Sequence, residues 1–195
     1  MAGGLLLLAA ALVLTGMNLL EDQQAGAKSE RVRKELERQV PETLLQTAGP
    51  EVPDYMLYPE QEMPVSEIGG QDYIGILEIP SLQISLPVMS QWSYKNLKTA
   101  PCRYYGSAYK ENMVIAGHNY RAHFGGLRSL SPGAQVKFTN MEGNGFVYEV
   151  AGIEILEPVA VEALVDEAWD LTLFTCTYGG ENRVAVRCVA AGEGK

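Results

Sequence analysis

The sequence has little cysteine and still less histidine, with three cysteines and two histidines in 195 residues. Three cysteines leave at least one thiol unpaired, which excludes a disulfide scaffold. A zinc site fails on spacing, because no CxxC or HExxH occurs and four well-placed ligands are hard to assemble from five scattered residues. Each thiol is therefore either a buried packing residue or a reactive group.

Basic residues are also scarce. There are 15 Lys and Arg against 24 Asp and Glu, which gives a formal net charge of −9. A phosphate backbone requires a basic stripe, and the cationic residues here are scattered, so nucleic acid is excluded as a partner. The acidic surface favours solubility but does not identify a partner.

One long uncharged run lies near the N-terminus, from Gly3 to Leu20. As a helix it is about 27 Å long, just enough to span a hydrocarbon core of ~30 Å. We therefore predict that residues 1–21 form a retained transmembrane anchor. A cleaved signal peptide is the alternative, because Ala25-Gly26-Ala27 has the small-residue spacing of a cleavage site.

The basic residues that follow this run point to a cytoplasmic domain. The positive-inside rule would place Lys28, Arg31, Arg33 and Lys34 in the cytoplasm, with the C-terminal domain beside them. Basic residues upstream of Met1 would reverse that orientation, and the upstream reading frame tests this.

Residues 22–70 are predicted to form a helical stalk and a linker. The stretch from Ala27 to about Gln46 is rich in Glu, Arg, Lys, Leu and Gln, and is expected to be an exposed helix. Its apolar residues are spaced by four: Val32, Leu36 and Val40. Pro41 is expected to break or restart the helix. Four prolines between Gly49 and Gly70 predict an irregular linker that wraps the domain.

Residues 71–195 have an all-β pattern, with short β-branched and aromatic runs divided by turn residues. The predicted strands are Tyr73–Ile79, Gln83–Val88, Met113–Ala116, Ala134–Thr139, Phe146–Ile155, Leu171–Cys176 and Arg183–Ala190. Seven or eight strands in this length favour a closed or nearly closed barrel, since closure removes exposed edges. Short helices are expected near Tyr94–Leu97 and Phe124–Leu130.

The last two predicted strands are joined by Thr177 to Asn182, where Gly179-Gly180 permits a chain reversal. A regular hairpin would make Cys176 and Arg183 cross-strand partners, with Cβ atoms ~5 Å apart. A guanidinium beside a thiol favours the nucleophilic thiolate and can donate to a developing oxyanion. The alternative is an ordinary surface arginine. Period two places Cys188 on the opposite face, in the core.

Of the two histidines, His118 ends an apolar strand and His123 lies in the following loop. A lone histidine is more often structural than catalytic, but His118 occurs with a Cys and Arg pair. Together the three residues predict acyl transfer, in which Cys176 attacks a carbonyl, Arg183 stabilises the oxyanion and His118 protonates the departing amine. Cys102 is uninformative, and a disulfide between Cys102 and Cys188 stays open.

The run Thr172-Leu173-Phe174-Thr175-Cys176 resembles the TLxTC signature of sortases. Further stretches resemble the family in the expected order, over roughly Tyr73 to Ala190. They are Gly75 to Pro80 with Leu86-Pro87-Val88, Asn112 to Asn119 around the family's catalytic histidine, and Arg183 to Arg187 in its final strand. Gly117-His118-Asn119 resembles class B members, whereas the compact length resembles other classes such as A or D, so the class stays open.

The resemblance implies an eight-stranded sortase-type β-barrel with a membrane tether. It assigns the catalytic roles to His118, Cys176 and Arg183, and it places Thr175 and Asn119 at the peptide. The stretch from Glu154 to Trp169 would be the loop that sets specificity. No cofactor or metal is expected, because no acidic cluster maps onto the calcium site of some class A members.

The implied reaction is cleavage of an LPxTG-like sorting signal through a thioester on the cysteine. The partners would be the sorting signal of a secreted surface protein and an amine acceptor, either a cell-wall precursor or a pilin lysine. The expected location is the cell membrane of a Gram-positive-type bacterium, single-pass, with the catalytic domain extracellular. The alternatives are a cysteine peptidase, an L,D-transpeptidase of the wall, and a tethered β-barrel that only binds a partner.

Overall fold

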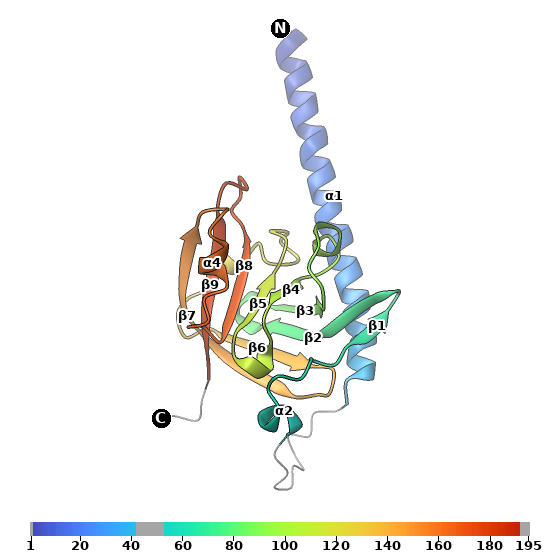
Figure 1. Cartoon of the computed structure of the whole chain (residues 1–195). Helices are drawn as coiled ribbons and strands as arrows, with labels where there is room; N and C mark the ends of the chain where they lie inside the picture. The colour runs from blue at the N-terminus through green and yellow to red at the C-terminus, as the bar shows by residue number, and fades with distance from the viewer. Residues whose placement is uncertain (1, 42–52, 192–195) are drawn as a thin grey trace.

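The computed structural model describes residues 2–41 and 53–191 of the chain (Figure 1). The strands are β1 (Ser66–Ile68), β2 (Gln71–Ile79), β3 (Ile84–Met89), β4 (Cys102–Tyr105), β5 (Met113–Ala116), β6 (Gln135–Asn140), β7 (Gly145–Leu156), β8 (Leu171–Cys176) and β9 (Arg183–Ala190). The α-helices are α1 (Ala2–Gln39), α2 (Asp54–Leu57), α3 (Tyr94–Leu97) and α4 (Val161–Leu164). Short 3-10 helices include η3 (Leu127–Ser129).

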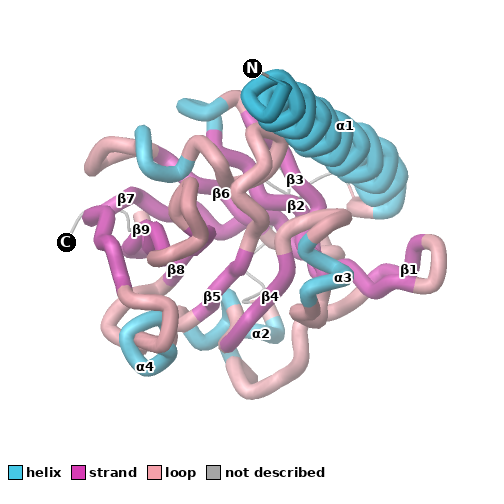
Figure 2. The backbone as a smooth tube through the Cα atoms, turned by 90° about the horizontal axis from the view of Figure 1, so that it is seen from above, coloured by secondary structure: helices cyan, strands magenta, loops and turns pink. Residues whose placement is uncertain are grey.

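The sheet closes on itself because β2 pairs with both β3 and β6. The strand order is β1-β2-β3-β4-β5-β8-β9-β7-β6, and β6 returns to β2. Strands β2 to β9 therefore form the closed eight-stranded barrel that was predicted, and the short β1 is added beside the start of β2. The β3–β4 and β5–β8 pairs are parallel. Figure 2 shows α1 on the outside of the barrel, beside β2 and β3.

All seven predicted strands are present, with bounds within two residues of those expected. The helix predicted at Tyr94–Leu97 is α3, and η3 lies inside the second predicted helical region. Strands β1 and β4 were not predicted. β4 is only four residues long and pairs with β3 through a single residue, so its conformation depends on pairing with β5.

Alternation along the strands divides the side chains between two faces. In β8, Leu171 and Leu173 face the barrel core and are fully buried. Phe174 lies on the outer face, where it packs with Leu164 of α4. The same alternation carries Cys176, two residues beyond Phe174, to the outer face.

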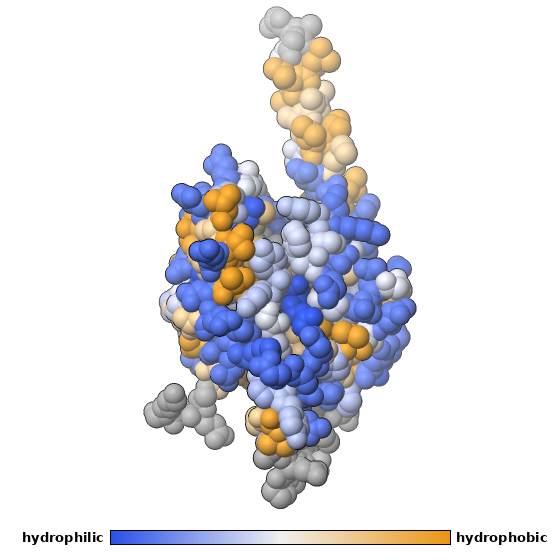
Figure 3. All heavy atoms as spheres, viewed as in Figure 1, coloured by the Kyte–Doolittle hydropathy of each residue, from blue (hydrophilic) through white to orange (hydrophobic). Residues whose placement is uncertain are grey.

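The first part of α1 carries exposed apolar side chains from Leu6 to Leu20 and extends beyond the barrel (Figures 1 and 3). Within the described residues, α1 is the one helix long and apolar enough to cross a membrane, judged on length and composition. The helix ends at Gln39, shortly before Pro41, as expected from the missing N–H of proline.

The second part of α1 is not the exposed stalk that was predicted. Leu36 is fully buried, and with Val32 it packs against Tyr73 of β2 and Met89 of β3. Apolar residues spaced by four form one helix face, and the barrel surface covers that face. Residues 42–46 of the predicted stalk lie outside the described residues.

The linker packs on the barrel where it is described. Tyr55 of α2 stacks on Tyr109, with ring centroids 4.9 Å apart and planes at 12°. Met63 is buried in the main core. Residues 49–52 of the predicted linker lie outside the described residues.

Candidate active site

The β8–β9 hairpin has the predicted register, with Cys176 opposite Arg183. In the turn, the Thr177 N–H donates to the Asn182 carbonyl at 2.9 Å. Gly180 has a φ of +76°, in the left-handed region that favours glycine. Cys176 is therefore the last residue of β8, directly before a tight turn, and its side chain is exposed.

The three thiols have different environments. All are free, so no bond joins Cys102 to Cys188, and these two lie in separate apolar clusters. Burial raises the pKa of both Cys102 and Cys188 to about 12. The prediction that Cys188 is a core residue is confirmed. Cys176 is the one thiol that a substrate can reach.

The strand order brings His118 to the same end of the sheet. β5 lies parallel to β8, with Ala116 opposite Phe174, and the Gly117 N–H donates to the Phe174 carbonyl at 2.9 Å. His118 and Cys176 are each two residues beyond the pair Ala116 and Phe174. β5, β8 and β9 are neighbours in the sheet, so His118 just beyond β5, Cys176 at the end of β8 and Arg183 at the start of β9 lie at the same end of the barrel.

The His118 ring is half-buried and stacks on Tyr120, with centroids 3.8 Å apart and planes at 13°. Burial lowers the pKa of His118, while the Asn119 side chain and the Glu21 carboxylate oppose that shift. Its Nδ1 is buried and has no hydrogen-bond partner among the described residues. A lowered pKa favours the neutral imidazole, which can accept a proton.

Arg183 is half-buried and donates from Nη1 to the carbonyls of Gly180 and Asn182, both at 3.2 Å. Both contacts are to the backbone of its own hairpin. The guanidinium is therefore held beside the turn that follows Cys176, where its remaining N–H groups can meet a developing negative charge.

The two residues predicted to bind the substrate, Asn119 and Thr175, lie on either side of the hairpin end. The Asn119 side chain donates to the Thr177 carbonyl at 3.5 Å, which is a long contact. Thr175 is buried, and alternation places its side chain on the inward face, opposite to that of Cys176. Contact between Thr175 and a substrate on the outer face is thus limited to its backbone.

An apolar strip on the outer face leads to Cys176. It contains Val114, Ala116, Phe174 and Ala185, and Leu164 of α4 packs on it. Tyr104 meets the Phe174 ring edge to face, with centroids 5.2 Å apart. β7 extends to Leu156, so the covering segment is 157–170 and not the longer stretch that was predicted from Glu154.

Arg187 attaches this segment to the sheet. It is buried on the outer face, where Nε donates to Glu154 at 3.0 Å and Nη1 donates to Thr172 at 3.1 Å. It also donates to the backbone carbonyls of Ala163 and Leu164. One arginine therefore joins β7, β8 and the segment that contains α4.

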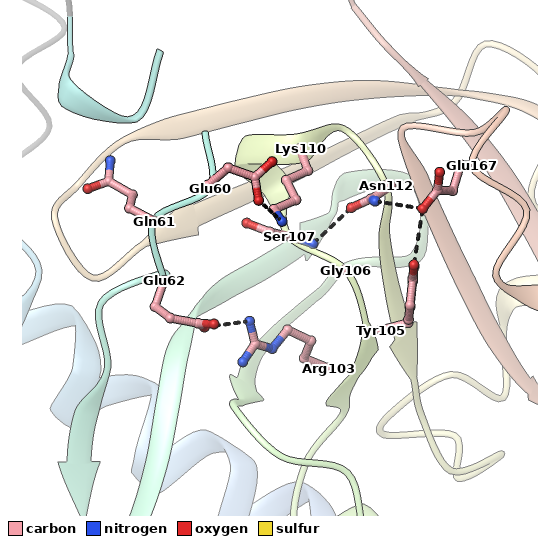
Figure 4. A pocket seen from close by; sticks show the side chains of 10 residues that line it. All are labelled: Glu60, Gln61, Glu62, Arg103, Tyr105, Gly106, Ser107, Lys110, Asn112 and Glu167. Atoms are coloured by element: carbon pink, nitrogen blue, oxygen red, sulfur yellow. Dashed lines mark hydrogen bonds and ion pairs between the residues drawn. The ribbon is translucent and has the colours of Figure 1, made fainter. Parts of the chain in front are cut away.

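Among residues 2–41 and 53–191, no group of three His, Cys, Asp or Glu side chains is arranged to hold a metal. A polar cavity of about 490 Å³ lies near Asn112, at the start of β5 and thus away from His118 (Figure 4). Its own side chains pair across it, including Glu62 with Arg103 at 3.6 Å and Tyr105 with Glu167 at 3.0 Å. The cavity contains none of the predicted catalytic residues.

A family model for the sortase domain matches residues 77–191, more than half of the chain. The chain therefore belongs to the sortase family, and its closed barrel is the sortase fold. Sortase A of Bacillus anthracis is 29% identical over 143 residues, covering 68% of this chain. The match spans 64% of that relative's own length.

Solved sortase structures share the fold. Sortase C1 from Streptococcus suis is 27% identical with a TM-score of 0.53, covering 62% of this chain and 73% of that one. A sortase D5 transpeptidase from Clostridium perfringens has a TM-score of 0.63 at 18% identity, covering 85% of this chain and 99% of that one.

Two residues that contact the candidate site or its covering segment were missed from the sequence: Tyr120 beside His118, and Arg187, which lies opposite Thr172 towards the other end of β8. Arg187 lies four residues after Arg183 on β9. Strand alternation therefore predicts that the two arginines share a face, but it does not predict that Arg187 is buried. Tyr120 lies in an irregular loop, where no periodicity predicts which side chain stacks on the histidine.

Proposed function

We propose that the chain is a membrane-anchored cysteine transpeptidase that cleaves an LPxTG-like sorting signal and transfers the acyl group to an amine. The observation that carries the proposal is that Cys176, the exposed thiol, lies opposite Arg183 in the hairpin register, at the end of the strand paired with β5, which ends two residues before His118. These are the three groups that a thiol-dependent acyl transfer requires.

In the first half-reaction, His118 takes the thiol proton and the Cys176 sulfur attacks the carbonyl carbon of the signal's threonine. Arg183 donates to the oxyanion of the tetrahedral intermediate. The C–N bond to glycine then breaks, and the proton on His118 goes to the leaving amine. A thioester on Cys176 remains.

In the second half-reaction, an amine nitrogen attacks the thioester carbonyl. His118 accepts a proton from that nitrogen, the C–S bond breaks, and His118 gives the proton to the departing Cys176 thiolate. The lowered pKa of His118 supports this sequence, because a neutral imidazole is available for both proton acceptances. The acceptor would be a cell-wall precursor or a pilin lysine.

The apolar strip on the outer face supports a peptide channel that ends at Cys176. Segment 157–170 covers this strip through Leu164, and it is held in place by Arg187. We propose that a sorting signal binds between this segment and the sheet, with Asn119 and the backbone of Thr175 next to the scissile bond.

We further propose that α1 is a single-pass anchor with the catalytic domain on the outside of the cell. The apolar side chains from Leu6 to Leu20 are exposed, while the helix from Ala25 onward packs on the barrel. The unbroken helix would hold the catalytic end of the barrel close to the membrane surface.

The test uses the full-length chain in detergent micelles, a panel of LPxTG-type peptides and an amine such as triglycine. We expect peptide cleavage, a peptide adduct of Cys176 detectable by intact-mass spectrometry, and a ligated product that requires the amine. Cys176→Ala should lose all three signals and keep its fold by circular dichroism. If the peptides are hydrolysed and no ligated product forms with the amine, the chain is better described as a peptidase. If no sorting peptide forms an adduct with Cys176, the proposal is overturned.

A further inference from the structure

The membrane-proximal part of α1 docks on the loop that follows His118. The Tyr120 hydroxyl donates to a Glu21 carboxylate oxygen at 3.2 Å, and the Ala122 N–H donates to an Asp22 carboxylate oxygen at 3.1 Å. Glu21 is the first charged residue after the apolar run. The helix therefore contacts the histidine loop where the apolar segment ends.

Two further contacts make this docking close. Ser29 of α1 lies 2.9 Å from Nε2 of His123 and donates to the Thr99 carbonyl at 2.7 Å. A Cβ on Gly26 would lie 3.0 Å from the Cβ of Ala122, so a larger residue there would force the helix and loop apart. Burial lowers the pKa of His123 to about 4, which favours a neutral ring in this contact.

Tyr120 links this docked helix to the candidate acid and base. Its ring stacks on His118 at 3.8 Å, and its hydroxyl is the group that contacts Glu21. In many sites a histidine base is oriented by a hydrogen bond from its second nitrogen to a carboxylate or carbonyl. Nδ1 of His118 has no such partner among the described residues, and the face of its ring is covered by the stack on Tyr120.

We propose that Tyr120 is a positioning residue for His118 and that Glu21 of the anchor helix holds Tyr120 in place. The active site is then completed by α1, which is more than a tether. The kinetic consequence of this inference rests on the proposed function. If the His118 ring is displaced by about 1 Å, the reaction rate can fall on the order of 10²-fold.

The first set of variants separates the ring of Tyr120 from its hydroxyl. Tyr120→Leu removes the stack, Tyr120→Phe removes only the hydroxyl, and Tyr120→Trp restores an aromatic face. We expect kcat to fall on the order of 10²-fold in the Leu variant. Loss of one hydrogen bond in the Phe variant should cost about fivefold. The Trp variant should recover most of the Leu loss, whereas KM should change little throughout.

The second set tests the helix. Glu21→Ala removes the acceptor of the Tyr120 hydroxyl and should match Tyr120→Phe, while Glu21→Gln keeps an acceptor and should stay near wild type. Gln24→Ala on the exposed side of α1 and Tyr58→Leu on the linker are the matched controls. If Glu21→Ala behaves like Gln24→Ala, Glu21 does not hold Tyr120 in place.

A spectroscopic readout separates this inference from the proposed function. The chain has two histidines, so histidine-selective labelling gives two imidazole resonances, which His118→Gln assigns. We expect loss of the ring-current shift of His118 in Tyr120→Leu and its retention in Tyr120→Phe. The pKa of His118 should also move, because burial lowers it, the Glu21 carboxylate raises it and Lys98 lowers it.

The outcomes are distinct. An unchanged His118 resonance in Tyr120→Leu, or a kcat within twofold of wild type, overturns the positioning role. If the wild type cleaves no sorting peptide, the proposed function fails, while the resonance still decides whether Tyr120 and Glu21 hold the imidazole. Should Tyr120→Leu fail to fold, Glu21→Ala and Tyr120→Phe decide the matter.

Discussion

At the residue scale, β9 carries two arginines on one face with different surroundings. Arg183 donates to two backbone carbonyls of its own turn, and it lies opposite Cys176. Arg187 is buried and shared between a carboxylate, a hydroxyl and two carbonyls. The guanidinium of Arg183 therefore has N–H groups left to bind a substrate, whereas that of Arg187 holds β7, β8 and segment 157–170 together.

Arg183→Lys should lose far more activity than conservation of charge implies. Lysine lacks the planar fork of donors that a guanidinium presents to an oxyanion. We expect kcat to fall on the order of 10²-fold or more, measured by cleavage of a sorting peptide. Arg128→Lys on the exposed surface is the control, and wild-type rates in Arg183→Lys would contradict the assigned role.

The two histidines should differ in the same assay. His118→Ala should lower kcat by roughly 10² to 10⁴, the usual contribution of a general acid and base. His123→Ala should lose less, because His123 is fully buried against Ser29 of α1 and its ring is not exposed at the surface. The opposite ranking would reassign the acid and base to His123.

At the element scale, two segments outside the barrel pack near the candidate site: segment 157–170 with α4 packs on the outer face of β8, and α1 contacts the loop that follows His118. Neither is part of the barrel. Each is held by a few polar contacts and a small apolar patch, Leu164 for the first and Leu36 for the second. Both segments can therefore loosen while the barrel stays intact.

Arg187→Leu should release segment 157–170. The change removes hydrogen bonds from a charged donor, each worth about 1.5–3 kcal/mol. We expect a higher KM for the sorting peptide with a smaller change in kcat. The exposed Glu162 and Glu167 should be cut faster by a glutamate-specific protease. Arg128→Leu is the matched control. An unchanged KM and an unchanged rate of proteolysis would show that Arg187 does not hold segment 157–170 on the sheet.

The docking of α1 should weaken in acid. The pKa of His123 is about 4 in the fold, below the ~6.5 of an exposed histidine, because burial disfavours its charged form. The unfolded chain thus binds the proton first, so stability is lost as pH falls from about 6.5 towards 4. Chemical denaturation against pH should show this slope, and His123→Gln should flatten it. The same slope in the variant would rule out His123 as its source.

At the scale of the whole molecule, one continuous helix joins an exposed apolar segment to the barrel end that carries Cys176. Glu21 and Asp22 contact the loop next to His118, so the base of the apolar segment and the candidate site are adjacent. Substrates presented at a membrane surface would meet the site directly.

A membrane-impermeant maleimide on intact cells without an outer membrane should therefore label the full-length chain at Cys176. Cys102 and Cys188 are buried and serve as internal controls, and Cys176→Ala should stay unlabelled. Labelling only after lysis would place the domain in the cytoplasm, as the basic residues from Lys28 to Lys34 indicate by charge alone.

Much of the barrel and the hairpin register followed from the sequence by itself. Strand alternation and the six-residue loop between Cys176 and Arg183 are local properties, and a loop of fixed length sets which residues pair. The exclusion of a disulfide scaffold and the apolar character of residues 3–20 were equally local. These features depend on residues that are close together in the chain, so they can be predicted from the sequence without the tertiary structure.

The tertiary structure alone decided where distant segments meet. It buried Leu36 on the barrel, brought Tyr120 between Glu21 and His118, and placed Arg187 against the carbonyls of segment 157–170. Such contacts depend on the closure of the barrel and the path of the linker, because residues 24 to 99 positions apart share no local pattern in the sequence.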